Sequence, residues 1–219
     1  MTPPHEQTER KASDYLGPLT ACFTTILILS NIISAKLMNF FGLPLDTGII
    51  IFPLSYILGD VLTDVYGFKE SRRVIWTGFA LLLFSTLTIH LATIAPPAPG
   101  WHGQQAFEQA FGLVPRISLA SLIAYLFGEM TNGWMLELLK KRAPHNRRFI
   151  RFIGSTIVGE AVDTTLFLCI AFGGVWPLQQ LLIVGTLNYV FKVSFEVPFL
   201  PITYRLSTWL RKKEGILIT

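Results

Sequence analysis

The sequence predicts an all-α integral membrane protein with about six transmembrane helices and both termini in the cytoplasm. Three observations lead to this prediction. Hydrophobic residues make up 51% of the 219 residues and charged residues only 15%, against about 25% in a soluble domain. The apolar residues fall into runs of about 20, the length that crosses a bilayer. Most of the Lys and Arg residues stand between these runs.

Six candidate spans follow a polar tail at 1–15 and precede a short tail at 211–219. They cover 16–42, 47–66, 74–95, 113–139, 149–173 and 178–209, and together form one transmembrane domain over 16–210. The second span is the weakest, because it contains one proline and two aspartates. The last span is long and contains Pro198 and Pro201, which we expect to kink or break the helix.

The positions of the cations predict the topology. Most of the 18 Lys and Arg residues stand in the amino-terminal tail, after the second and fourth spans, and in the carboxyl-terminal segment. The loops after the first, third and fifth spans contain none, so the positive-inside rule places both termini in the cytoplasm. Gly59-Asp60 and Gly159-Glu160 occupy matching places in the two halves, which allows two inverted three-helix repeats; chance similarity is the alternative.

Ionisable side chains inside the spans are the candidates for function. Each costs about 2.5–3.5 kcal/mol at the centre of a span, so we expect them to face a polar interior. Those near mid-span, with two asparagines, form the candidate substrate site: Asn31, Asp60, Glu129, Glu160, Asp163, Asn188 and Lys192. Candidates for proton coupling or gating are Lys36, Asp64, Arg116 and Glu196, and candidates for stacking are Tyr56, Tyr125 and Tyr189.

Structural roles remain open for the same residues. Lys192 could pair with Glu196 one turn along its helix. Asp64 could pair with a nearby loop cation, and Lys36 and Arg116 could extend toward the membrane interface. The interior acids could make contacts between helices, and the tyrosines could simply pack.

Several classes of site are not supported by the sequence. The four histidines are scattered without carboxylate partners at ligand spacing, so neither a metal site nor a cofactor is predicted. The motifs of intramembrane metalloproteases, serine hydrolases and P-loop proteins are missing. The basic pI of about 9.2 is explained by the loop cations, and no nucleic-acid partner is expected.

The segment IIIFPLSYILGDVLTDVYGFKESRR at 49–73, preceded by NIISAK at 31–36, resembles the queuosine precursor transporters, also called the vitamin uptake transporter family. The similarity continues through 115–132 and 151–174 and, more weakly, 188–201, so it covers nearly all of 16–210. It implies a secondary-type transporter in the bacterial inner membrane that imports 7-deazaguanines such as preQ0, preQ1 or queuine. The motif positions carried over are Asn31, Lys36, Asp60, Asp64, Tyr66, Arg116, Glu129, Arg151, Ser155, Glu160, Asp163, Lys192 and Glu196.

The chemistry of a deazaguanine is compatible with these residues. One carboxylate can accept its adjacent ring N–H and exocyclic amine together. The family more often has Gln near position 129, so Glu160 or Asp163 is the better candidate to read this edge. Asn31 and Asn188 would contact the carbonyl, while Lys192 or Asp60 would balance charge.

Three other functions are weighed against this one, of which a purely structural scaffold would not need so many interior acids. The first is a substrate-binding subunit of an energy-coupling-factor vitamin importer, which would copurify with an ATPase. The second is an intramembrane enzyme acting on a lipid. Membrane lipid is an expected partner in every case, and a homodimer is an open alternative for the assembly.

Overall fold

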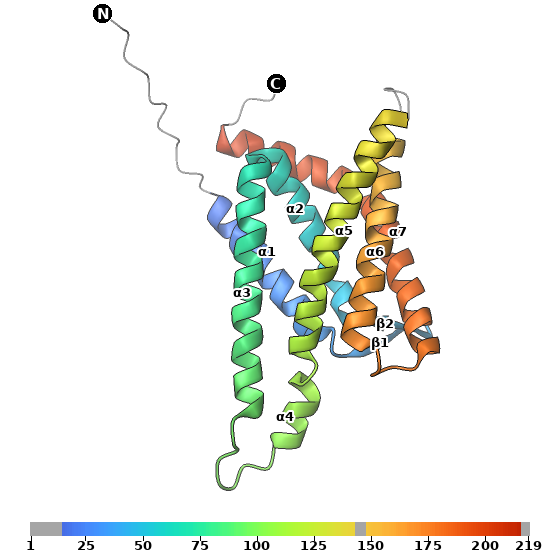
Figure 1. Cartoon of the computed structure of the whole chain (residues 1–219). Helices are drawn as coiled ribbons and strands as arrows, with labels where there is room; N and C mark the ends of the chain where they lie inside the picture. Colours follow the sequence, from blue (N-terminus) through green and yellow to red (C-terminus); the bar gives the residue numbers. More distant parts are fainter. Residues whose placement is uncertain (1–14, 143–147, 216–219) are drawn as a thin grey trace, which may run out of the picture.

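The computed structural model describes residues 15–142 and 148–215, which form long α-helices and one small β-hairpin (Figure 1). The predicted tails therefore lie largely outside the described residues. In chain order the elements are α1 (Leu16–Ile33), β1 (Leu37–Phe40), β2 (Leu43–Asp46), the 3-10 helix η1 (Thr47–Ile50), α2 (Phe52–Tyr66), α3 (Phe68–Ile94), α4 (Gln104–Phe111), α5 (Val114–Arg142), α6 (Arg148–Phe172) and α7 (Leu178–Glu214).

Several of these helices suit a membrane. Within the described residues, four segments are long and apolar enough to cross one: Leu16–Ile33, Phe68–Ile94, Gln104–Asn132 and Ile153–Phe172. Their outer faces carry large apolar side chains, such as Phe84 and Leu87 on α3, which are 68% and 56% exposed. Exposed apolar faces of this kind are expected where lipid covers them. A count of six spans, the inverted repeats and the cytoplasmic termini stay predictions.

The connection between α1 and α2 differs from the expected one. We expected the first span to continue to residue 42, but α1 ends at Ile33 and an antiparallel hairpin pairs Leu37 with Asp46. Its two-residue turn has positive φ at Phe41 and Gly42, 50° and 86°, as a type I′ turn requires. A helix through Gly42 and Pro44 would be costly, since both residues disfavour a helix interior. The predicted extension of the helix to 42 is therefore wrong.

Different elements lie at the two ends of the molecule. Figure 1 shows the hairpin, α4 and the α6–α7 turn at one end, and the α2–α3 junction and the adjoining ends of α5 and α6 at the other. At this second end, Glu214 accepts hydrogen bonds from the Tyr15 backbone N–H (3.1 Å) and the Tyr66 hydroxyl (2.7 Å). Arg211 donates to an Asp64 carboxylate oxygen at 2.7 Å. The end of α7 is therefore fastened to α1 and α2.

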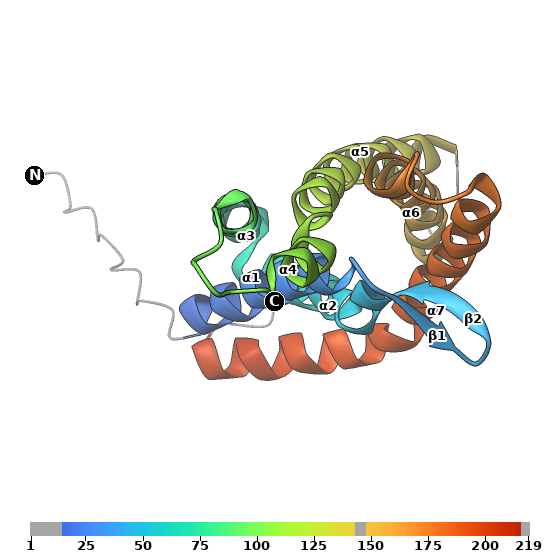
Figure 2. The ribbon, with the colours of Figure 1, turned by 90° about the horizontal axis from the view of Figure 1, so that it is seen from below.

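The last helix, α7, bends without ending. Its first half lies beside α6, and its second half crosses the ends of α1 and α2 (Figures 1 and 2). Leu210, in the second half, packs against Val61 and Val65 of α2. The helix continues to Glu214, past the predicted end of the span at 209. Pro198 and Pro201 stand within it, and a proline bends a helix because it removes a backbone hydrogen bond and crowds the preceding turn.

Besides the cluster around Leu210, two larger apolar clusters form the interior. One joins α1, α2 and α3 around Phe23, Leu62 and Leu82. The other joins α5, α6 and α7 around Ile117, Phe172 and Val184 and is extended by neighbouring side chains, including Ala35 and Leu37 near the hairpin. Elements of both groups form the walls of one cavity.

The antiparallel helices α5 and α6 are fastened at the hairpin end by Arg116. Its side chain donates hydrogen bonds to the backbone oxygens of Ile170, at 2.6 Å, and Gly173. These carbonyls belong to the last turn of α6 and the residue after it, where no further helical N–H is available to pair with them. Arg116 therefore supplies donors that the end of α6 lacks.

Replacing Arg116 by Met should lower the midpoint of thermal unfolding. Hydrogen bonds to a charged group contribute about 1.5–3 kcal/mol each, and the substitution removes both donors. Arg116→Lys should have an intermediate effect, since an ammonium lacks the forked geometry of guanidinium. Thermal unfolding in mild detergent measures this, with the exposed Lys213→Met as control. Equal stability of Arg116→Met and the control would contradict the proposed fastening.

Candidate functional site

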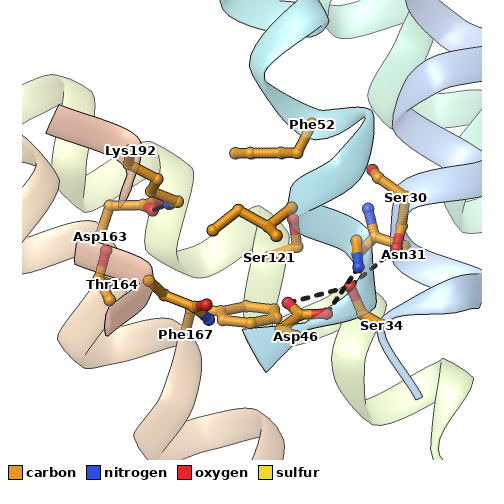
Figure 3. Close-up of a pocket in the computed structure, with 13 residues that line it drawn as sticks. Ser30, Asn31, Ser34, Asp46, Phe52, Ser121, Asp163, Thr164, Phe167 and Lys192 are labelled. Carbon is orange, nitrogen blue, oxygen red and sulfur yellow. Dashed lines mark hydrogen bonds and ion pairs between the residues drawn. The ribbon is translucent and has the colours of Figure 1, made fainter. Parts of the chain in front are cut away.

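A cavity lies where the two groups of helices meet (Figure 3). It holds about 500 Å³ of space between its walls, part of it open to solvent. The part of this space in which the centre of a water-sized molecule fits is about 40 Å³, so the enclosed part of the cavity is narrow. Its polar lining residues are Ser30, Asn31, Ser34, Asp46, Ser121, Asp163, Thr164, Asn188 and Lys192, and the remainder are Gly48, Ile49, Phe52 and Phe167. They come from α1, β2, η1, α2, α5, α6 and α7.

A cation and two carboxylates form a cluster on one side of the cavity. Lys192 Nζ lies 2.5 Å from Asp163 Oδ2 and 3.3 Å from Glu160 Oε2. The carboxylate residues stand three apart on one face of α6, which lets both reach the same ammonium. All three side chains are 11% exposed. Lys192 Nζ also lies 5.0 Å from the centre of the Phe52 ring, a cation–π distance.

Lys192 has partners on a second helix, because Asp163 and Glu160 face it from α6. The alternative pairing with Glu196 along α7 stays a prediction. The side chain of Glu196 lies outside the described residues. The cluster carries one positive and two negative formal charges, so it presents a net negative side to the cavity.

Neutral polar groups complete the lining. Asn31 donates its side-chain N–H to the backbone oxygen of Leu27 at 2.8 Å, which directs its own Oδ1 elsewhere. Among the described residues, Asn31 Oδ1, Asn188 Oδ1 and Thr164 Oγ1 are buried without a hydrogen-bond partner. Leaving buried acceptors unpaired costs free energy. A polar ligand or bound water is therefore expected to complete their bonding.

Asp46 and Ser34 were missed by the sequence analysis. Asp46 is only 6% exposed, and it accepts hydrogen bonds from the Gly48 N–H at 2.8 Å and the Ser34 hydroxyl at 3.2 Å. Burial raises the pKa of Asp46 to about 6, despite the opposing effect of these two bonds and of Lys192. The only feature of the sequence around it is the turn Asp46-Thr47-Gly48. An aspartate at the start of such a turn usually has the structural role of accepting a backbone hydrogen bond.

Four more predicted residues lie beside the cavity rather than in its wall. The ring of Tyr56 contacts the ring of Phe52, with centroids 5.1 Å apart. Its hydroxyl is near enough to Glu160 and Asp163 to interact with their charges. Tyr125 is similarly close to Glu129, Asp60 and Asp163. Glu129 and Asp60 are exposed. Glu129 stands eight residues beyond Ser121 on α5, about 12 Å along the helix axis. These groups therefore continue the polar surface toward the far end of the molecule.

Other predicted residues are not brought to the cavity: Lys36, Asp64, Arg116 and Tyr189. Lys36 is exposed at the start of the hairpin. The Tyr189 hydroxyl donates to the backbone oxygen of Ile157 at 3.2 Å. Asp64 and Arg116 make the contacts described above at opposite ends of the molecule. In the described part of the chain, no group of three or more His, Cys, Asp and Glu is placed to hold a metal ion.

Comparison with known proteins adds independent information. A family model described as "Putative vitamin uptake transporter" matches residues 46–206, more than half of the chain. The chain belongs to this family. This membership establishes that the protein is a membrane transporter and not an enzyme. The alternative of an intramembrane enzyme is therefore wrong.

Two curated relatives are similar over most of their length. The "Probable queuosine precursor transporter" of Bacillus subtilis (strain 168) is 30% identical over 201 residues, which is 91% of this chain and 85% of the relative. The "Queuosine precursor transporter" of Escherichia coli (strain K12) is 24% identical over 192 residues, 86% of this chain and 84% of the relative. No solved structure matches the chain significantly.

Proposed function

We propose that this family member imports a 7-deazaguanine precursor of queuosine, such as preQ0, preQ1 or queuine, across the bacterial inner membrane as a secondary-type transporter. The supporting observation is the cavity, which places acceptor-rich polar groups and aromatic rings in a chain whose relatives are named for that substrate. The two termini would be cytoplasmic.

The lining offers complementary groups for each part of such a base. Carboxylate and amide oxygens can accept the ring N–H and exocyclic amine, and the Lys192 ammonium can donate to the carbonyl. Phe52 and Phe167 supply apolar surface for the planar ring. In the view of Figure 3, Asp163 and Lys192 lie on one side and Asn31 on the other, so a bound ring could contact α1 and α6 together.

The polar groups beyond the cavity suggest a coupling route. Asp60, Tyr125 and Glu129 lie between the cavity and the end where Arg211 pairs with Asp64. We propose that these acids exchange the coupling proton. The Asp64–Arg211 pair and the Tyr66–Glu214 hydrogen bond would close this end and separate when it opens.

The proposal is tested by ligand-dependent stabilisation of the purified protein in mild detergent. A panel of preQ0, preQ1, queuine, guanine and two unrelated vitamins should shift the unfolding midpoint only for a deazapurine. A ligand at 100 times its dissociation constant stabilises the folded state by about 2.7 kcal/mol. Folded protein that responds to no deazapurine would contradict the proposal. Copurification with an ATPase would instead favour the importer-subunit alternative.

A further inference from the structure

We propose that Asp46, at the end of the hairpin, is the carboxylate that accepts hydrogen bonds from the N–H groups on one edge of the substrate. Asp163 and Glu160 of α6, which pair with Lys192, would not have this role. This inference rests on the proposed function and assigns the specificity of that site. It starts from a difference between the acids in and beside the cavity: Asp163, in its wall, and Glu160, behind it, share the Lys192 ammonium, at 2.5 and 3.3 Å. Within the described residues, no cation lies within ion-pair distance of Asp46.

The hydrogen bonds of Asp46 leave acceptor sites unused. Gly48 N–H occupies one site on Oδ1. The Ser34 hydroxyl lies 3.2 Å from Oδ2 and shares its single hydrogen with the nearer Ser30 backbone oxygen, at 2.8 Å, so it occupies at most one site on Oδ2. An ionised carboxylate offers about four such sites. At least one site therefore remains on each oxygen, which is the arrangement that two adjacent N–H donors of a planar base require.

The neighbouring side chain on α1 presents a further acceptor. One of the two side-chain N–H groups of Asn31 donates to the Leu27 backbone oxygen, and its buried Oδ1 has no partner in the described part of the chain. Figure 3 shows Asn31 and Ser34 on the side of the cavity nearest Asp46, away from Lys192. This side offers mainly acceptors, whereas the opposite side combines the Lys192 ammonium with the acceptor oxygens of Asp163 and Thr164. A ligand with N–H donors at one edge and a carbonyl elsewhere suits that polarity.

Asp46 is also held in place before any ligand arrives. Its carboxylate caps η1 through Gly48, and Gly48 packs so closely that an added Cβ would meet the Ser34 Oγ at 2.1 Å and the Ser30 backbone oxygen at 2.7 Å. This contact limits how closely η1 and the end of α1 can approach each other. A carboxylate held in this way loses little conformational freedom on binding.

The test compares two ligands on the full-length protein: preQ0 and its analogue without the exocyclic amine. The wild type should bind preQ0 the more tightly. Asp46→Asn replaces one acceptor by a donor. It should reduce preQ0 affinity roughly tenfold to hundredfold and change the affinity for the analogue little. The variant should therefore lose the preference for preQ0 over the analogue. Asp46→Ser should do the same, because serine keeps the helix cap and lacks the carboxylate.

Asp163→Asn is the matched comparison. It should weaken both ligands alike and keep their ratio. The assignment to Asp46 would be overturned if folded Asp46→Asn or Asp46→Ser kept the full preference for preQ0 over the analogue. It would also be overturned if only Asp163→Asn lost that preference. Either result would leave the proposed function intact. A wild type that binds no deazapurine would overturn both.

Discussion

Replacing Lys192 by Met should both destabilise the protein and abolish substrate uptake. The ammonium pairs with two buried carboxylates, Asp163 at 2.5 Å and Glu160 at 3.3 Å. Removing one partner of a buried ion pair costs about 3–5 kcal/mol, because a charge is left without compensation. Thermal unfolding in detergent measures the first effect, and uptake of labelled preQ1 into cells lacking their own transporter measures the second.

A double variant separates charge from function. Lys192→Met combined with Asp163→Asn removes one positive and one negative charge, so it should recover part of the stability and none of the uptake. Lys212→Met, an exposed cation on the same helix, should leave both measurements near those of the wild type. If Lys192→Met unfolds at the same temperature as Lys212→Met, the ion pair contributes nothing to the fold.

Replacing Gly159 by Ala should force α5 and α6 apart. An added Cβ would lie 2.8 Å from the Cβ of Asn132 and 3.1 Å from the backbone oxygen of Gly128. Neither atom can move away by a rotation of its own side chain, so the helices must separate. Overpacking typically costs about 1–3 kcal/mol, partly offset by the better helix propensity of Ala, about 1 kcal/mol.

Gly159→Ala should also disturb the cavity. Asp163 stands one turn beyond Gly159, and a Cβ on Gly128 would meet its Cβ at 2.9 Å. A shift of α6 would therefore displace Asp163 from Lys192 and weaken ligand binding as well as stability. Gly59→Ala is the matched control, since no atom lies within 4 Å of its added Cβ, and it should be neutral or stabilising. Equal stability of the two variants would show that α5 and α6 are not tightly packed at Gly159.

The sequence could predict several of the cavity residues by one physical argument. Asn31, Asp163, Asn188 and Lys192 are polar side chains within apolar runs, and such groups must avoid lipid by facing inward. The cavity contains all four. The same argument could not find Asp46, because it stands between two apolar segments, where an acidic residue is ordinary.

Local spacing likewise could not choose between possible partners. Lys192 and Glu196 stand one turn apart, and Asp64 has several cations nearby in sequence. The structure pairs Lys192 with Asp163 on α6 and Asp64 with Arg211 at the end of α7. Both partners are distant in the chain, and only the packing of α7 against α6 and α2 brings them close.

By itself the sequence determined the class of protein, the approximate positions of its helices and the family to which it belongs. These properties follow from composition, the lengths of apolar runs and a motif contiguous in the chain. Tertiary structure alone decided that residues 37–46 form a hairpin whose second strand lies beside α7, with Asp46 buried next to Ser34. The reason is that burial and ion pairing depend on which helices meet, and those contacts join residues separated by tens of positions.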